Sequence, residues 1–419
     1  MSAIFLRKHI QDGETMIHKI LHTSDWHIGR RLKEHDRNEE FRNFFDWLEK
    51  LIVSENIDTL LVSGDIFDNT TPTVTAQKIY YSFLTALAKS PCRHTVIISG
   101  NHDSPAFLDA PAELLSLSDI HVIGQACENP ADEVLALKDS DGNTELIVCA
   151  VPYLRDRDVR RLTLSDNPED SDKILQAGIR EHYAQVFSHA RELQGDSGVP
   201  VVAMGHMFLK GGRVQADDGT RELYVGTAIR VDANIFPEWL TYTALGHLHS
   251  PQKSGRENIR YSGAPLAMGF GEAGQDKAVY VLELDGKNLS GLKEIRIPVF
   301  QRLERVSGDL PEIFGQLQDL AGQHESVWAE VTYTGDDLAP DLQENLQAFA
   351  KSCPMVEILS VRNESKSRPF NEPAAEGLES VSPMKMLDLC FEANNTPKDK
   401  QKIFIPLYQE ILRGLEVDY

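Results

Sequence analysis

Five short polar motifs follow one another along the first 250 residues, and their side chains are of the kinds that bind metal ions. They are Asp25-Trp26-His27, Gly64-Asp65-Ile66-Phe67-Asp68, Gly100-Asn101-His102-Asp103, Gly205-His206 and Gly246-His247-Leu248-His249. Carboxylate and amide oxygens together with imidazole nitrogens suit Mn²⁺, Fe or Zn²⁺, whereas structural zinc sites are usually rich in cysteine. The motifs therefore predict a metal site with mixed nitrogen and oxygen ligands, where a pair of ions would need a bridging carboxylate.

Each motif is a weak signal by itself, because Gly-Asp, Gly-Asn and an aspartate at a strand end are also common turn sequences. Their order along the chain, each after an apolar run, is what favours a metal site. The glycines that precede Asp65, Asn101, His206 and His247 would let the backbone turn sharply and approach the site closely.

The motifs lie among apolar runs that alternate with helical patterns, and these patterns predict the strands and helices that would position the motifs. Strands are predicted at 17–23, 57–63, 95–99, 145–151, 199–204 and 240–245, and helices at 36–56, 74–89 and 173–193. This alternation predicts a layered α/β fold in which the sheet faces are covered on both sides. Because sites in such folds lie beyond the carboxyl ends of the strands, we expect the five motifs, spread over residues 16–270, to converge on one crevice.

The pattern changes after residue 270. Strands predicted at 277–284 and 327–333 and a helix at 311–322 carry no catalytic motif, so 271–368 are predicted to form a smaller α+β module. Residues 369–383 are predicted to be a linker, and 384–419 a helical hairpin whose apolar stripe either packs on the chain itself or binds a partner. Residues 1–15, before Met16, are interpreted as an N-terminal extension.

The composition limits the classes of protein. With 419 residues, 41% hydrophobic and 25% charged, the chain is expected to form several globular domains, not a rod, a collagen or a disordered chain. Membrane-span and signal-peptide patterns are missing from the sequence, and five scattered cysteines fit a reducing cytoplasm. A formal charge of −22 argues against binding nucleic acid through bulk positive charge, but not against a local grip through metal ions and a few arginines.

The ordered motifs resemble those of the calcineurin-like metallophosphoesterases. Within that family the chain is similar to the nuclease subunits of the bacterial SbcC–SbcD type, through the strings Leu21-His-Thr-Ser-Asp-Trp-His-Ile-Gly, Val151-Pro-Tyr-Leu-Arg-Asp-Arg-Asp and Tyr261-Ser-Gly-Ala-Pro. The resemblance covers almost the whole chain after Met16. It implies a layered metallophosphoesterase sandwich with a capping domain and a C-terminal helical hairpin.

The resemblance also implies a role for each motif residue. One metal would be held by Asp25, His27, Asp65 and His249, and a second by Asp65, Asn101, His206 and His247, with Asp65 as the bridge. The ions would be Mn²⁺ in the first instance, with Mg²⁺, Fe and Zn²⁺ left open. His102 would act at the scissile phosphate or leaving oxygen without binding metal, and Asp103 would orient its imidazole. The role of Asp68 is left open.

Arginines near the motifs are the expected DNA contacts. They are Arg30, Arg31, Arg155 and Arg157, although the aspartates between and after the last two could neutralise that loop instead. The resemblance implies a further partner, an SbcC-type ATPase that supplies much of the DNA grip and docks on 384–419. It also implies a homodimer within a heterotetramer.

The function implied is a metal-dependent DNA nuclease that uses a water activated by two metals. It would act as a double-strand exonuclease and a single-strand or hairpin endonuclease in DNA repair, replication and recombination. The rival functions are a small-molecule phosphoesterase, a phosphoprotein phosphatase and a scaffold with a vestigial metal site. The string around Trp26, the capping segment and the hairpin favour the nuclease, and the intact ligand set disfavours the scaffold.

Overall fold

The computed structural model describes residues 17–159, 168–213, 230–335, 341–364, 384, 387, 391 and 398–415. The expected extension at 1–15 and linker at 369–383 lie outside these residues. The chain divides into two compact units, the first comprising residues up to 305 with 325–329, and the second comprising 306–324 and the residues from 330 on. None of the described helices is long and apolar enough to span a membrane.

The first unit contains two six-stranded sheets. The first sheet has the order β16 (Asn288–Arg296), β15 (Ala278–Asp285), β1 (His18–Thr23), β4 (Thr59–Ser63), β5 (His94–Ile98) and β6 (Ile120–Ile123). The second has the order β13 (Gln252–Ser254), β14 (Arg256–Tyr261), β12 (Tyr242–Gly246), β9 (Val201–His206), β8 (Thr144–Ala150) and β7 (Val134–Lys138). Strands β1, β4, β5 and β6 are parallel, as are β14, β12, β9 and β8, so each set has its carboxyl ends at one edge.

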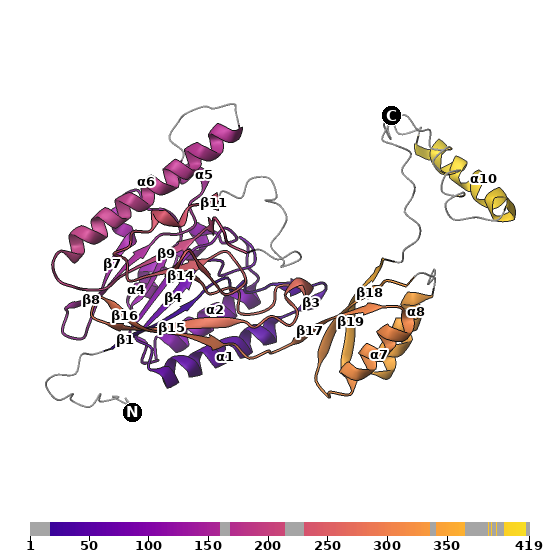
Figure 1. Ribbon diagram of the computed structural model, residues 1–419, viewed down its shortest axis with the longest axis horizontal. Helices are drawn as coiled ribbons and strands as arrows, with labels where there is room; N and C mark the ends of the chain where they lie inside the picture. Colours follow the sequence, from indigo (N-terminus) through magenta and orange to yellow (C-terminus); the bar gives the residue numbers. More distant parts are fainter. Residues whose placement is uncertain are drawn as a thin grey trace. The chain divides into compact units, whose positions relative to one another are not determined.

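Helices cover the outer faces of the two sheets (Figure 1). Helices α1 (Asn38–Glu55) and α2 (Val74–Leu87) pack on the first sheet, and α6 (Pro168–Gln194) packs on the second. A third apolar cluster, which includes Ile20, Val96 and Met204, fills the space between the sheets. The predicted layered α/β fold is therefore confirmed as a four-layer sandwich of helix, sheet, sheet and helix.

The sequence explains these layers locally. In α1 the residues Phe41, Phe44 and Leu48 recur at helical spacing and are fully buried. Trp26, from the first motif, lies edge-on to Phe45 of α1 with ring centroids 4.9 Å apart, and it is fully buried. The apolar face of α1 thus holds the loop that carries the first two candidate metal ligands.

Short elements lie between the main strands and helices of the first unit. They are β2 (Arg31–Leu32), β3 (His35–Asp36), α3 (Pro105–Asp109), α4 (Ala112–Ser116), α5 (Asp156–Val159), β10 (Phe208–Leu209) and β11 (Arg230–Val231), with 3₁₀ turns η1 (Pro130–Glu133), η3 (Ala233–Ile235) and η4 (Phe270–Glu272). A three-stranded sheet has the order β17 (Arg302–Gly308), β18 (Val327–Tyr333) and β19 (Val356–Asn363), and the second unit also contains α7 (Leu310–Ala321) and α8 (Leu342–Ser352). Near the C-terminus, α10 runs over Lys398–Leu415.

The domain boundary expected at residue 271 is wrong. Strand β15 lies within one residue of its predicted bounds, but it pairs antiparallel with β1, with Leu21 opposite Val281, and so belongs to the first sheet. Val279 and Val281 pack in the cluster that includes α1, while Leu282 faces the cluster between the sheets. A strand buried on both faces needs a covered sheet, which the first unit provides, and the boundary therefore falls near residue 305.

Candidate metal centre

The five motifs meet where the carboxyl ends of the two sheets come together. Asp25, Asp65 and Asn101 follow β1, β4 and β5 of the first sheet, while His206 ends β9 and His247 follows β12 of the second. The imidazole Nε2 of His206 lies 3.3 Å from Asp65 Oδ2 and 3.1 Å from Asn101 Oδ1. The convergence expected from the sequence is confirmed.

One half of the centre gathers Asp25, His27 and His249, whose ligand atoms all lie within 4.8 Å of one another. The Nε2 atoms of His27 and His249 are 3.2 Å apart. Two imidazole nitrogens at about 2.0–2.1 Å from a common ion, at tetrahedral or octahedral angles, would be separated by about 2.8–3.4 Å. The backbone N–H of His247 donates to Asp25 Oδ1 at 2.8 Å, which ties this half to the second sheet. These side chains fit a divalent ion.

The other half surrounds Asn101. Its Oδ1 lies 3.0 Å from His247 Nδ1 and 3.1 Å from His206 Nε2. Asp65 stands between the halves, because its Oδ2 is 3.5 Å from His27 Nε2 and 3.3 Å from His206 Nε2. The position of this carboxylate is the one that a bridge between two ions requires.

Close backbone approach depends on glycine, as predicted from the motifs. Gly64 has φ +83°, and a Cβ there would lie 2.3 Å from His206 Nδ1. A Cβ on Gly100 would lie 2.1 Å from Asp65 Oδ1. Any side chain at these two positions would displace a candidate ligand.

The backbone of several candidate ligands is strained. Asp25, His27 and Asp65 have φ of 50°, 49° and 51°, and His247 has φ of 103°. Residues other than glycine rarely adopt positive φ, and such strain gathers at functional sites where the surrounding fold imposes it. The fold therefore holds these side chains in an arrangement that the local sequence alone would not favour.

Burial and the charges of neighbouring side chains determine which candidate ligands are protonated. Burial lowers the pKa of His247 to about 3 and that of His27 well below its usual value, so both imidazoles are neutral, the form that binds metal. Burial opposes charge on Asp65 as well, but His206, His27 and His102 together outweigh it and hold the pKa of Asp65 well below its usual range. Burial likewise disfavours the charged form of His206, yet Asp65 raises the pKa of His206 to about 9.

Groups behind the ligands orient them, and the sequence analysis missed the main one. Glu272 is fully buried, with Oε1 3.4 Å from His249 Nδ1 and Oε2 2.5 Å from Lys277 Nζ. On the other side, His206 Nδ1 donates to the carbonyl of Ser63 at 2.9 Å. Such contacts fix the ring and leave the opposite nitrogen available to bind an ion. No sequence motif marks Glu272, which lies 23 residues after His249 in η4.

The role expected for Asp103 is wrong. Its buried carboxylate accepts hydrogen bonds from the backbone N–H groups of Ile66 at 3.0 Å, Phe67 at 2.9 Å and Gly100 at 2.8 Å. Two of these N–H groups belong to the loop after β4 and one to the loop after β5, so the Asp103 carboxylate joins the two loops. The imidazole of His102 has another partner.

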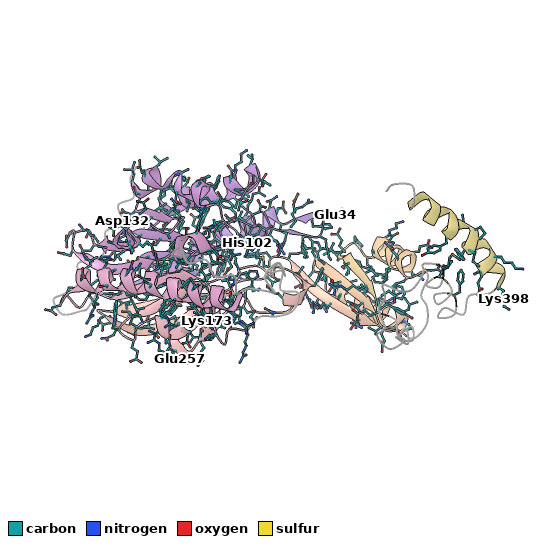
Figure 2. The ribbon with its side chains drawn as sticks, turned by 90° about the horizontal axis from the view of Figure 1, so that it is seen from above. Glu34, His102, Asp132, Lys173, Glu257 and Lys398 are labelled. Carbon is teal, nitrogen blue, oxygen red and sulfur yellow. The ribbon has the colours of Figure 1, made fainter. Side chains whose placement is uncertain are left out.

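His102 is oriented by Asp68, a residue whose role the sequence left open. The Nδ1 of His102 donates to the backbone carbonyl of Asp68 at 3.0 Å, and its backbone N–H donates to Asp65 Oδ1 at 2.9 Å. His102, which is labelled in Figure 2, has an intermediate burial that leaves it partly exposed. Its ring lies edge-on to that of His27, with centroids 4.8 Å apart, so His102 lies beside the candidate ligands.

Two of the four expected DNA-contacting arginines reach the loops of the centre. Arg30 Nη1 donates to Asp68 Oδ1 at 3.1 Å, and Arg155 Nη2 donates to the carbonyl of Asp103 at 3.0 Å. The other two are surface residues with acidic neighbours. Arg31 has an exposed side chain that pairs with Asp36 at 3.0 Å, and Arg157 has an exposed side chain 3.5 Å from Asp158.

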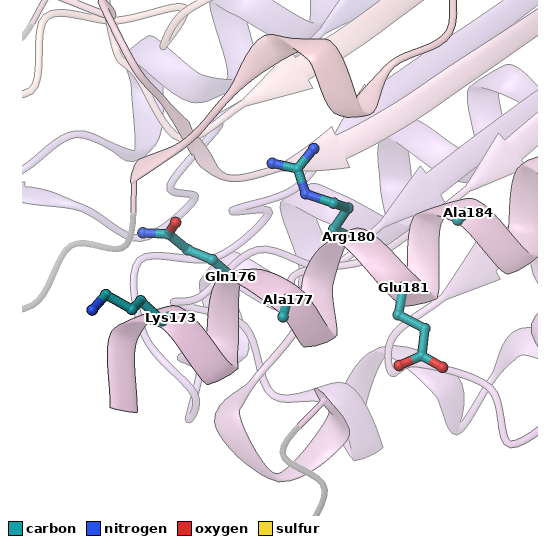
Figure 3. Close-up of a pocket in the computed structure, with 6 residues that line it drawn as sticks. All are labelled: Lys173, Gln176, Ala177, Arg180, Glu181 and Ala184. Carbon is teal, nitrogen blue, oxygen red and sulfur yellow. The ribbon is translucent and has the colours of Figure 1, made fainter. Parts of the chain in front are cut away.

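A separate shallow hollow of about 390 Å³ lies along α6 (Figure 3). Its lining residues all come from that helix, and Figure 3 shows the side chains of Arg180 and Glu181 leaving the helix in different directions. Arg180 Nη1 donates to Asn234 Oδ1 at 2.9 Å. Among the described residues, none of the candidate metal ligands lines this hollow, so it is not part of the centre.

Comparisons with known proteins agree with this geometry. The calcineurin-like phosphoesterase family matches residues 18–251, and the family described as type 5 capsule protein repressor C-terminal domain (SbcD_C) matches 299–395. The SbcD subunit of the nuclease SbcCD from Escherichia coli K12 is 33% identical over 402 residues, which cover 95% of this chain and 98% of that protein. The protein of the same name from Rhodobacter capsulatus is 30% identical, covering 85% and 90%.

Among solved structures, a dimetal phosphatase from Danio rerio is 12% identical, with a TM-score of 0.39, covering 67% of this chain and 99% of that one. This likeness is too distant to add to the assignment, which depends on the family matches and the relatives. The chain therefore belongs to the calcineurin-like phosphoesterase family and, within it, to the SbcD family of metal-dependent nucleases.

Proposed function

We propose that this chain hydrolyses DNA phosphodiester bonds with Mn²⁺ as its metal, as a double-strand exonuclease and a single-strand or hairpin endonuclease. Its setting would be DNA repair, replication and recombination in the cytoplasm. The single observation that carries the proposal is the carboxylate of Asp65, which lies 3.5 Å from His27 Nε2 and 3.3 Å from His206 Nε2. A phosphodiester would bind across the two halves of the centre that this carboxylate joins.

The chemistry of the donor set supports Mn²⁺. The candidate ligands offer carboxylate, amide and imidazole groups without a thiolate, a mixture that Mn²⁺ accepts, as Fe and Zn²⁺ do. When bound, a pair of such ions neutralises charge on phosphoryl oxygens and lowers the pKa of water. The fully buried Glu272 holds His249 in place for such an ion.

His102 is the proposed acid at the leaving oxygen. Since its Nδ1 donates to the carbonyl of Asp68, the ring is fixed and Nε2 is the atom that can hold and release a proton. A positioned acid of this kind contributes about 10²–10⁴ in rate. Its partial exposure leaves room for a substrate beside it.

Two features favour DNA over a small phosphoester. Arg30 and Arg155 are attached to loops of the centre, where guanidinium groups could contact phosphates on either side of the scissile bond. The relatives are named as subunits of a nuclease, SbcCD. We propose an SbcC-type ATPase as the partner that supplies the remaining grip on DNA, with two copies of each chain in the complex.

The test is cleavage of an end-labelled blunt duplex with Mn²⁺, with and without SbcC and ATP. We expect the labelled strand to shorten in Mn²⁺, faster with SbcC and ATP, and to stay intact when the ion is chelated. Mononucleotides and phosphoamino acids serve as competing substrates. Rapid hydrolysis of those compounds, with an intact duplex even when SbcC and ATP are present, would contradict the proposal and favour the small-molecule or phosphoprotein alternative.

The docking site for SbcC is proposed to be the C-terminal segment 384–419. On α10, Phe404 and Leu407 are 50% and 52% exposed, which leaves apolar surface available to a partner. Deleting 384–419 should abolish SbcC binding in a pull-down and leave Mn²⁺-dependent cleavage of a small phosphodiester unchanged.

A point-variant pair sharpens the docking test. Phe404→Ala combined with Leu407→Ala should weaken SbcC binding at least about tenfold, because burying one large apolar side chain contributes about 1.5–3 kcal/mol. Lys400→Ala, at an exposed position of the same helix, is the matched control. SbcC binding that survives the deletion would place the dock elsewhere.

A further inference from the structure

A second group of metal-binding side chains lies at the opposite end of the first sheet from the metal centre. His94 is the first residue of β5, Asp119 precedes β6 and His121 is the second residue of β6. The metal centre lies beyond the other end of β5, and from His94 to Ile98 the strand extends about 13 Å. The two groups are therefore separate sites.

The geometry brings the three side chains together. One ligand atom from each of His94, Asp119 and His121 lies within 4.8 Å of those of the other two. In the strand register, Val96 is opposite His121, and since His94 is two residues before Val96, both histidines lie on the same face of the sheet. The cluster thus depends on strand pairing as well as on proximity in sequence.

The hydrogen bonding of His94 supplies an independent indication of a ligand. Its side chain is 6% exposed, and Nε2 donates to the carbonyl of Lys138 at 2.9 Å, with Glu145 Oε1 3.2 Å away. The other ring nitrogen, Nδ1, is buried and has no hydrogen-bond partner among the described residues. A histidine that binds metal usually donates its other ring N–H to a carbonyl or carboxylate, which is the arrangement seen here.

The backbone around Asp119 is already fixed. Its carbonyl accepts a hydrogen bond from the backbone N–H of Thr95 at 3.0 Å, and its own N–H donates one to the carbonyl of Ser116 at 3.1 Å. These two hydrogen bonds hold Asp119 at φ 54°. The guanidinium of the neighbouring Arg93 forms ion pairs with Glu145 at 2.7 Å and Asp58 at 3.3 Å, and not with Asp119. An incoming cation would therefore not compete with the guanidinium of Arg93 for these ligands.

We propose that His94 Nδ1, His121 and the Asp119 carboxylate bind one divalent transition-metal ion of the Zn²⁺ type, separate from the ions of the metal centre. Two imidazoles and one carboxylate are a ligand set that Zn²⁺ accepts, with water in the remaining position. Asp119 is exposed and His121 partly buried, so an ion can enter from solvent. The ion would join the start of β5 to β6, which is one of the two edge strands of the first sheet.

The test is the Zn²⁺ content of the full chain, depleted of metal and then equilibrated with micromolar Zn²⁺. We expect His121→Gln and Asp119→Asn each to bind one Zn²⁺ per chain fewer than the unaltered protein, while Mn²⁺-dependent cleavage of DNA stays unchanged. Asparagine tolerates positive φ, so the second variant removes the charge without straining the turn. His189→Gln, at a partly exposed position of α6, is the control and should keep the full content.

The same difference of one Zn²⁺ should appear when the variants are made on an Asp65→Asn background, since the sites are independent. The result therefore does not depend on the proposed nuclease function. Equal Zn²⁺ content in the unaltered chain and both variants would overturn the proposal. Binding by the unaltered chain only at millimolar Zn²⁺ would also overturn it, because it would indicate an adventitious ion only.

Discussion

Replacing Asp65 with asparagine is expected to lower Mn²⁺-dependent DNA cleavage by at least about 10³-fold. Removing one group that stabilises transition-state charge typically costs about 10²–10³ in rate. Asp65 should exceed that range because its Oδ2 lies close to both His27 Nε2 and His206 Nε2 and would serve both ions. We also expect fewer Mn²⁺ ions to be bound per chain.

Asparagine is the informative replacement at this position. Asp65 has φ 51°, which asparagine adopts more readily than alanine does, so the turn after β4 should be kept. The amide oxygen can still accept the hydrogen bond that the backbone N–H of His102 donates to Asp65 Oδ1. The variant therefore changes the charge and leaves the shape nearly the same.

The measurements are the initial rate of shortening of a labelled duplex and the Mn²⁺ bound per chain at equilibrium. Asp46→Asn, the same substitution at an exposed position of α1, controls for the change in net charge and should behave as the unaltered chain. If Asp65→Asn kept both the rate and the Mn²⁺ content, the bridging role would be wrong. Loss of cleavage with full Mn²⁺ content would restrict Asp65 to catalysis.

The parts of the fold that could be predicted are those with local causes. The spacing of Phe41, Phe44 and Leu48 specifies an amphipathic helix wherever it packs, and Asp25 and Asp65 lie at strand ends because apolar runs stop directly before them. The rule that parallel strands bring their carboxyl ends to one edge then sufficed to predict the convergence. Each of these inferences needs only a short window of sequence.

The parts that could not be predicted depend on distant partners. The sequence of β15 is that of a buried strand in either unit, and only its pairing with β1 decides which unit it joins. Asp103 is next to His102 in the sequence, but its carboxylate turns away to backbone N–H groups that come partly from the loop after β4. Glu272 reaches His249 only through the path of the chain between them. Such contacts leave no periodic or motif signal.

His102→Ala is expected to retain the bound Mn²⁺ and to lower DNA cleavage by about 10²–10⁴-fold, the contribution of a positioned general acid. A competing role for His102 is that of a metal ligand. His102 also forms a group with His27 and Asp65 whose ligand atoms lie within 4.8 Å of one another, so it could bind an ion itself. Its Nδ1 is engaged by the carbonyl of Asp68, which leaves only Nε2 for either role.

Comparison with His27→Ala separates the two roles of His102. His27 is fixed between His249 and Asp65, with Nε2 3.2 Å and 3.5 Å from them, so its removal should lower both the Mn²⁺ content and the cleavage rate. His102→Ala should lower the rate alone. Mn²⁺ content and the single-turnover rate of duplex cleavage, measured on both variants, give the answer. If His102→Ala lost Mn²⁺ to the same extent as His27→Ala, His102 would be a ligand, and the proton for the leaving oxygen would have to come from another group.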